Sequence, residues 1–207
     1  MLSERHRPRV RRALAVLGVV GAAVSSVALA PVATAAAAPI VSDGFSHAMK
    51  TGWGSANVGG DWKIYPRKKF AEITDGVAAL RLRGADTGVE AIATGAAVRD
   101  VSGTFDFALS KASQGSVFVS FIARRTAASD VRVRVGMAPG GALTVSAAAR
   151  EGTVERLVAS PVTLSGQTFT AGAVLRLEVV VTGAPTTTLK ARLYAPRPPR
   201  RPPGRCR

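Results

Sequence analysis

The feature that most constrains the fold is a period-two alternation of apolar and polar residues, which recurs in short runs from Asp61 onward. Residues 131–135 read VRVRV, and residues 175–181 alternate in the same way. Successive side chains of a β-strand point to opposite faces, so this pattern places the valines on one face and the arginines on the other. No stretch after residue 38 keeps a 3.6-residue period with caps, which leaves no sequence for the crossover helices of a parallel α/β fold. The chain is therefore predicted to be all-β.

Turn sequences rich in Gly, Pro and Asp separate the strand-like runs. Short strands at intervals of roughly 8–12 residues predict an antiparallel β-sandwich or jelly roll. Aromatic residues make up only 5% of the chain, so we expect Val, Leu, Ala and Ile to fill the core. The strand-like runs are 77–83, 103–109, 116–124, 131–135, 142–148, 174–182 and 187–194, and the turns are 74–76, 138–141, 151–152 and 183–185.

The formal net charge of +15 is concentrated at the two ends of the chain. Residues 1–12 hold five Arg and one Glu, and residues 197–207 hold five Arg and no acid. Residues 13–196 hold 18 Lys and Arg and 12 Asp and Glu, so their net charge is +6, which is ordinary for a soluble domain. Nucleic-acid recognition would need aromatic residues interleaved with a basic stripe. Because the sequence has no such stripe, we expect no nucleic-acid partner.

Residues 1–38 are organised like a helical secretory signal peptide. Residues 5–12 are basic, residues 13–29 carry no charge, and residues 33–38 are all small. Cleavage fits any of residues 35–38, and we favour cleavage after Ala38. An uncleaved membrane anchor is the alternative, but the apolar stretch is only weakly apolar for a span.

Arg11 and Arg12 raise the twin-arginine export route as an alternative to the general secretory route. The usual flanking Ser or Thr and Phe are missing, which favours the general secretory route. No second long apolar run follows the signal. We therefore expect the mature chain to be secreted and extracellular or associated with the cell surface, with membrane contact only during export.

Residues 43–62 read DGFSHAMKTGWGSANVGGDW, an Asp-x-Phe start followed by Gly-Trp-Gly-Ser-Ala-x-x-Gly-Gly-x-Trp. This frame resembles a module common in secreted and cell-surface proteins of actinobacteria. Segments 121–125, 129–135 and 175–194 fit the same module, so the resemblance covers about residues 42–195. The resemblance implies a concanavalin-like, jelly-roll β-sandwich that acts as a non-catalytic accessory or glycan-binding module.

The end of the chain departs from this module. In the family, a Trp-containing loop and two more strands follow, the last of them a V-x-F-D strand that pairs near the first strand. Here residues 196–207 read PRPPRRPPGRCR, and proline lacks the N–H that a strand ladder needs. We therefore expect a domain of residues 39–195 followed by a disordered Pro/Arg-rich tail. The hypothesis is a truncation or frameshift near codon 196, which would leave sheet edges unpaired.

Trp53, Trp62 and Tyr65 are the predicted ligand-binding residues. They could form a platform for sugars, because pyranose faces pack on flat aromatic rings. The alternative is that the two tryptophans plug the core, which is favoured because the chain has only two Trp. The four glycines of residues 52–60 are interpreted as turn formers rather than a phosphate cradle.

No catalytic residue is predicted. Hydrolysis by paired carboxylates needs two acids that flank one bond. Glu151 and Glu155 are separated by a turn, and Asp100 and Asp106 share strand parity, but a role in surface solubility is favoured for these acids. His47 is the single His after the signal, so Ser and Thr nucleophiles lack a base.

No metal or cofactor is predicted. One Cys and two His exclude a disulfide framework and leave little for a zinc or His-based centre. Asp43 would be the N-terminal ligand of a structural Ca²⁺, but its natural partner would lie in the missing last strand, so no site is assigned. The basic clusters 67–69 and 124–125 could face anionic glycans, although a solvated surface is favoured.

The sequence as a whole predicts a secreted, monomeric, non-catalytic accessory module with an extracellular glycan or cell-wall polymer as partner. Two alternatives stay open. One is a polysaccharide hydrolase or lyase of the same fold, and the other is a truncated remnant without independent activity.

Overall fold

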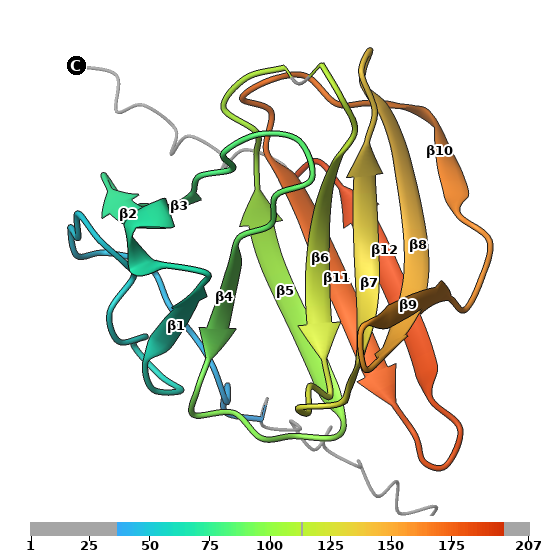
Figure 1. Cartoon of the computed structure of the whole chain (residues 1–207), viewed down its shortest axis with the longest axis horizontal. Helices are drawn as coiled ribbons and strands as arrows, with labels where there is room; N and C mark the ends of the chain where they lie inside the picture. Colours follow the sequence, from blue (N-terminus) through green and yellow to red (C-terminus); the bar gives the residue numbers. More distant parts are fainter. Residues whose placement is uncertain (1–36, 113, 197–207) are drawn as a thin grey trace, which may run out of the picture. The chain divides into compact units, whose positions relative to one another are not determined.

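The computed structural model describes residues 37–112 and 114–196. The chain divides into two compact units, Met1–Ala38 and Pro39–Arg207, and every described strand belongs to the second unit (Figure 1). The predicted signal peptide, apart from residues 37 and 38, and the predicted tail from residue 197 onward lie outside the described residues. Within the described ranges, no helix has the length and apolarity needed to cross a lipid bilayer.

The first part of the domain contains two small antiparallel sheets. β1 (Trp62–Tyr65) pairs with β4 (Glu90–Ala93), and β2 (Ala71–Thr74) pairs with β3 (Val77–Leu80). A 3₁₀ turn at Lys68–Phe70 leads into β2. The predicted turn at residues 74–76 closes the β2–β3 hairpin, where Asp75 and Gly76 both have positive φ, of 50° and 74°.

The remaining strands form two larger antiparallel sheets. In the first sheet the order is β10-β8-β7-β6, with β9 also paired to β8, and in the second it is β12-β11-β5. The strands of the first sheet are β6 (Val117–Ala123), β7 (Ser129–Met137), β8 (Ala142–Glu151), β9 (Val154–Leu157) and β10 (Val162–Thr168). The strands of the second are β5 (Val101–Phe107), β11 (Leu175–Thr182) and β12 (Thr188–Tyr194).

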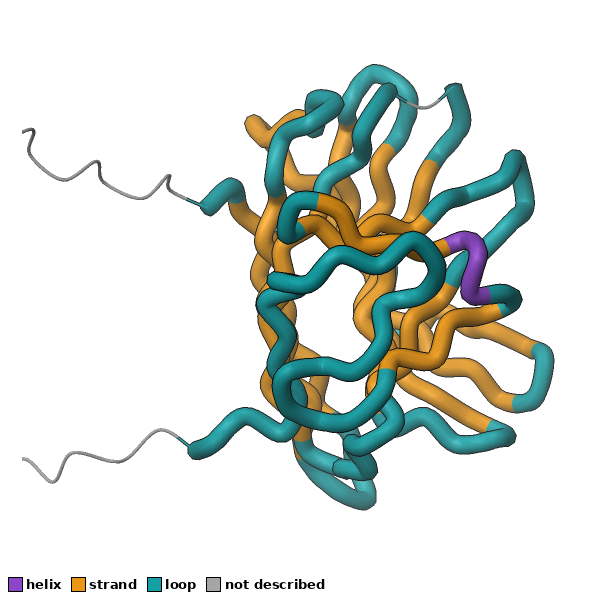
Figure 2. The backbone as a smooth tube through the Cα atoms, turned by 90° about the vertical axis from the view of Figure 1, so that its left-hand side faces the viewer, coloured by secondary structure: helices purple, strands orange, loops and turns teal. Residues whose placement is uncertain are grey.

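The main hydrophobic core lies between these two sheets, which Figure 2 shows as two layers of strands. Val133 and Val135 of β7 and Leu177, Val179 and Val181 of β11 are 2% exposed or less. All of them are odd-numbered, because strand side chains alternate between faces and one face of each sheet turns inward. The prediction of an antiparallel all-β fold is confirmed, and the packing is consistent with a β-sandwich.

The strand predictions were correct where alternation is strong and incomplete elsewhere. Each predicted run overlaps an observed strand, with one or both ends shifted. Five strands (β1, β2, β4, β9 and β10) have no predicted counterpart. They are short or polar, and β10 contains Gly166 and a register shift between Thr163 and Thr168, which hides the two-residue period.

Candidate functional site

Three aromatic rings close a second, smaller hydrophobic core near the start of the domain. The centroids of Phe45 and Trp53 are 5.3 Å apart, and those of Trp53 and Trp62 are 5.4 Å apart in an edge-to-face arrangement. Trp53 is only 8% exposed and packs with the buried side chains of Ile64 and Ile73. Edge-to-face packing of this kind stabilises aromatic clusters beyond the area they bury. Trp53 is therefore a core residue of this cluster.

Asp43 ties the first segment of the domain to the aromatic cluster. Its Oδ1 accepts a hydrogen bond from the backbone N–H of Phe45 at 2.9 Å, and its Oδ2 accepts one from Trp62 Nε1 at 2.8 Å. Both carboxylate oxygens thus have protein donors. The Asp-x-Phe and Gly-Gly-x-Trp halves of the sequence frame meet in space because this one side chain joins them.

Glycine allows the backbone around Trp53 to turn tightly. Gly52 and Gly54 have φ of 81° and 68°, a region that other residues adopt only with strain. A Cβ at Gly54 would lie 2.9 Å from Met49 Cε. The N–H of Gly52 donates to the carbonyl oxygens of Lys68 and Ala71, which fixes the loop to the start of β2. The glycines are turn formers, as the sequence predicted.

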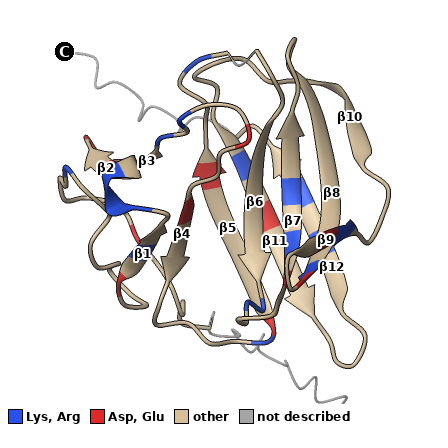
Figure 3. Ribbon diagram, in the orientation of Figure 1, with Lys and Arg blue, Asp and Glu red and all other residues tan. Residues whose placement is uncertain are grey.

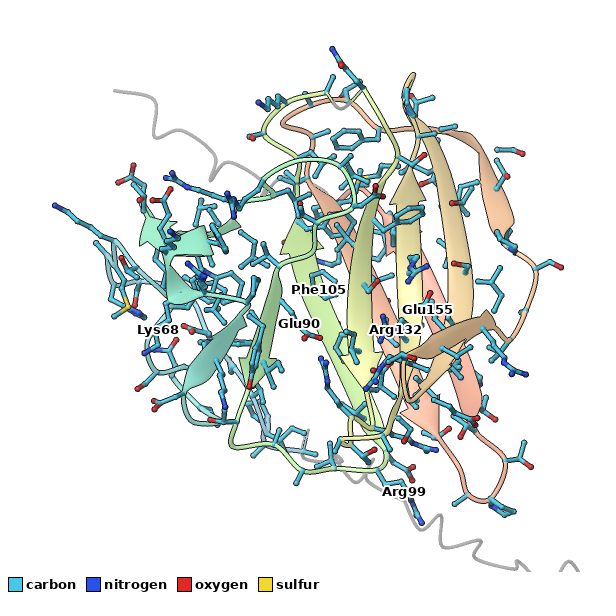
Figure 4. The ribbon with its side chains drawn as sticks, viewed as in Figure 1. Lys68, Glu90, Arg99, Phe105, Arg132 and Glu155 are labelled. Atoms are coloured by element: carbon cyan, nitrogen blue, oxygen red, sulfur yellow. The ribbon has the colours of Figure 1, made fainter. Side chains whose placement is uncertain are left out.

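A hollow of about 360 Å³ opens beside the two tryptophans. Its polar side chains are the hydroxyls of Thr51 and Ser55, the Asp61 carboxylate and Lys68, and Figure 4 labels Lys68 at this end of the domain. The Ser55 hydroxyl donates to Asp61 Oδ1 at 2.5 Å, and both residues are exposed. The full lining is Met49, Thr51, Gly52, Trp53, Gly54, Ser55, Asp61, Trp62 and Lys68. The lining thus brings two indole groups together with several polar side chains, and convergent polar groups of this kind can fix the orientation of a small ligand.

Tyr65 does not belong to this hollow. Trp62 and Ile64 share one face of β1 and contribute to the small core, whereas Tyr65 alternates to the opposite face and is 41% exposed. There the ammonium of Lys63 lies 5.3 Å from the centre of the Tyr65 ring. The three predicted aromatic residues therefore do not form a single platform, although Trp53 and Trp62 lie together.

The outer face of the first large sheet carries a charge network that the sequence predictions did not include. Asp130 is 3% exposed and accepts hydrogen bonds from Arg132, at 2.6 and 2.8 Å, and from Arg150, at 2.7 Å. Glu155 of β9 pairs with Arg132 at 2.9 Å and with Arg134 at 2.5 Å. Figure 3 shows these charges on β7 to β9, and Figure 4 labels Arg132 and Glu155 beside each other. The VRVRV alternation predicts that Arg132 and Arg134 share one face of the strand, but it does not identify their acidic partners.

The network explains the electrostatic state of Asp130. Burial alone would raise the pKa of the carboxyl group, but the hydrogen bonds and charges of Arg150 and Arg132 outweigh burial and hold the pKa below its ordinary value. The ion pair between Arg132 and Glu155 connects β7 to β9 across β8. Ala148, paired directly with Arg132, is small enough to be completely buried there.

Arg124 and two of the acidic residues considered for catalysis, Asp100 and Asp106, are held in structural contacts. Arg124 donates to the carbonyl oxygens of Arg99 and Gly183, each at 2.7 Å, and to Asp100 at 2.9 Å. Asp106 on β5 accepts from Arg176 at 2.6 and 2.8 Å, and the hydrogen bond from Arg176 keeps the pKa of Asp106 below its ordinary value.

His47 makes a backbone contact, with Nε2 donating to the carbonyl of Trp53 at 2.9 Å. No group of three potential metal-ligating side chains occurs among the described residues. No family model, curated protein or solved structure matches the chain. The resemblance of residues 42–195 to the actinobacterial module remains a prediction.

Proposed function

We propose that the chain is a secreted, non-catalytic accessory module that binds an extracellular glycan or cell-wall polymer in the hollow beside Trp53 and Trp62. On this proposal the domain is a concanavalin-like jelly roll, exported with the help of residues 1–38. The observation that carries the proposal is the hollow itself, in which indole groups stand beside a hydroxyl, a carboxylate and an ammonium group. Sugars offer the matching combination of apolar ring faces and hydroxyl groups.

The size and the lining of the hollow support a binding role. Its volume of about 360 Å³ lies at the lower end of the range of about 300–1,000 Å³ for small-molecule sites, which suits one end of a glycan or a short stretch of it. Asp61 is the one carboxylate among its lining residues. Glycoside hydrolysis by the usual route requires two carboxyl groups about 5–9.5 Å apart, so this lining favours binding over hydrolysis.

The test measures binding of the purified chain to a glycan array and to isolated bacterial cell walls. We expect Asp61→Asn to weaken binding about tenfold or more, because a hydrogen bond to a charged group contributes about 1.5–3 kcal/mol. Trp62→Ala should remove most of the binding. Tyr65→Ala, on the opposite face of β1, is the matched control and should bind like the wild type.

Circular dichroism and thermal melting of each variant separate a loss of binding from a loss of folding. Binding retained by both Asp61→Asn and Trp62→Ala would show that the hollow is not the site. Release of sugars from the same polymers by the wild-type chain would instead support the hydrolase or lyase alternative.

A further inference from the structure

The five-stranded sheet extends beyond the three-stranded sheet that it covers. Gly103 of β5 lies against the ring of Phe121 of β6, so these two strands lie opposite each other. The strand orders then place β11 opposite β7 and β12 opposite β8. No strand of the second sheet is left to lie opposite β9 and β10, and of β10 only Leu164 packs against the main core. Figure 1 shows β9 and β10 at one edge of the front layer.

Apolar side chains are exposed where the covering strand is lacking. Val162 of β10 pairs directly with Val145, which packs on the main core, so Val162 faces inward, yet it is 61% exposed. Val154 of β9 pairs with Glu151, on the same inward side of β8, and is 51% exposed. On β12, Ala191 is exposed although its direct partner Val179 is 1% exposed. Inward-facing apolar residues normally lose most of their contact with water.

Among the described residues, β12 also has an unpaired backbone edge. It pairs with β11 over seven consecutive positions, and β11 is the one strand among the described residues with which it forms a ladder. A regular edge strand without a bulge presents its unpaired N–H and C=O groups to another extended chain. The free edge and the exposed valines border the same space.

We infer that this edge of the sandwich binds an extended polypeptide segment that adds a strand to β12 and alternates apolar with acidic residues. The apolar residues would lie over Ala191 and beneath Val154 and Val162. The acidic residues would face Lys190 and Arg192, which are exposed on the outer face of β12 and form no salt bridge with any described residue. Recognition of this kind combines backbone hydrogen bonds with alternating side-chain contacts.

The charges on β12 also argue against a second copy of this chain as the occupant. In an antiparallel pair of two β12 strands centred on Ala191, Lys190 of one copy would face Arg192 of the other. Like charges directly opposite each other on adjacent strands are destabilising. An acidic partner strand replaces this repulsion with attraction. The inference goes beyond the proposed glycan binding, because the hollow lies at β1 and η1 and uses none of these residues.

The experiment uses the purified full chain and three synthetic seven-residue peptides with blocked ends. The first alternates Val with Glu, the second alternates Val with Lys, and the third is the Val/Glu peptide with alternate backbone amides N-methylated. Binding is measured by fluorescence anisotropy, and NMR chemical-shift changes locate it. We expect the Val/Glu peptide to bind about fivefold tighter than the Val/Lys peptide, from two cross-strand charge pairs. N-methylation should abolish binding.

Two charge variants test the assignment to β12. The double variant Lys190→Glu/Arg192→Glu should reverse the preference, so that the Val/Lys peptide binds more tightly. The variant Lys63→Glu/Arg67→Glu makes the same change in net charge away from β12 and should leave the preference unaltered. The inference is overturned if neither peptide binds, if the N-methylated peptide binds equally well, or if the reversal fails. A dimer of the chain alone that β12 substitutions disrupt would assign the edge to a second copy and also overturn it. Glycan binding by the same samples is scored separately, so either proposal can fail without the other.

Discussion

At the scale of single residues, Asp130 is the one buried charged group among the described residues. Its side chain is fully buried and lies between two arginines that are 14% and 20% exposed. Removing one member of a buried ion pair leaves the other charge without compensation, which is costly. The Asp130 carboxylate therefore stabilises the fold mainly by compensating the charges of Arg132 and Arg150.

Substituting this carboxylate should change both stability and its dependence on pH. We expect Asp130→Asn to lower the free energy of unfolding by about 2 kcal/mol at pH 7, after allowance for the partial exposure of the guanidinium groups. The folded-state pKa of Asp130 lies below its ordinary value of 3.8, so the unfolded chain takes up the proton at higher pH than the folded chain. The stability that Asp130 contributes is thus present above that ordinary value and is lost as the pH falls below it.

Urea unfolding at pH 7, 5 and 3 measures this prediction. The variant should lose less stability than the wild type between pH 5 and pH 3. Asp75→Asn, in the exposed β2–β3 turn, is the control and should match the wild type at each pH. If Asp130→Asn and the wild type lost the same unfolding free energy between pH 5 and pH 3, Asp130 would not be the source of this pH dependence.

At the scale of elements, the two large sheets are in close contact where β5 meets β6. Gly103 faces inward on β5, and a Cβ placed there would lie 2.7 Å from the ring of Phe121. The rings of Phe105 and Phe121 stack nearby, with centroids 6.3 Å apart (Figure 4 labels Phe105). The absence of a side chain at Gly103 allows β5 and β6 to pack at this distance.

Adding a methyl group at this position should therefore destabilise the fold. We expect Gly103→Ala to lower the free energy of unfolding by about 1–3 kcal/mol, as overpacking in cores does. Combined with Phe121→Leu, which makes room for the methyl group, the loss should be smaller than the sum of the two single losses. Gly84→Ala, where nothing lies within 4 Å of an added Cβ, is the control for chemical unfolding. Strict additivity of the two substitutions would show that the two strands do not contact each other here.

At the scale of the whole domain, the hydrophobic residues form two separate clusters of different size. The main cluster contains eleven buried residues between the large sheets. The smaller cluster contains four, Trp53, Ile64, Ala71 and Ile73, and is flanked by two-stranded sheets. Two-stranded sheets with little burial are only marginally stable. We therefore expect the smaller cluster, which carries the candidate ligand hollow, to open more easily than the main one, as binding regions commonly do.

Hydrogen–deuterium exchange should separate the two clusters. Amides of β2 and β3 should exchange through local opening, at least about tenfold faster than those of β7 and β11, which open with global unfolding. Mass spectrometry of peptic fragments provides the measurement. Equal protection across both clusters would mean that the domain unfolds as one cooperative unit.

Alternation along the chain predicted the strands of the main core well, because which face a side chain occupies depends only on its neighbours in sequence. In β7 and β11, this was enough to separate inward valines and leucines from outward charges. For the candidate site the prediction was partial. Trp53 and Trp62 were identified together with Tyr65, yet Tyr65 occupies the opposite face of β1. The sequence could not show that β1 exists, because four residues are too few for a periodic signal.

By itself, the sequence determined the all-β class, the turns and the faces of the strong strands, because these follow from local sterics and the two-residue period. Only the tertiary structure decided which strands pair, that Trp53 is buried, and that Asp130 holds two arginines. It also decided that β12 pairs with one strand only among the described residues and that Val154 and Val162 are exposed. Each of these depends on contacts between residues far apart in the chain, which come from sheet register and packing and leave no trace in a local pattern.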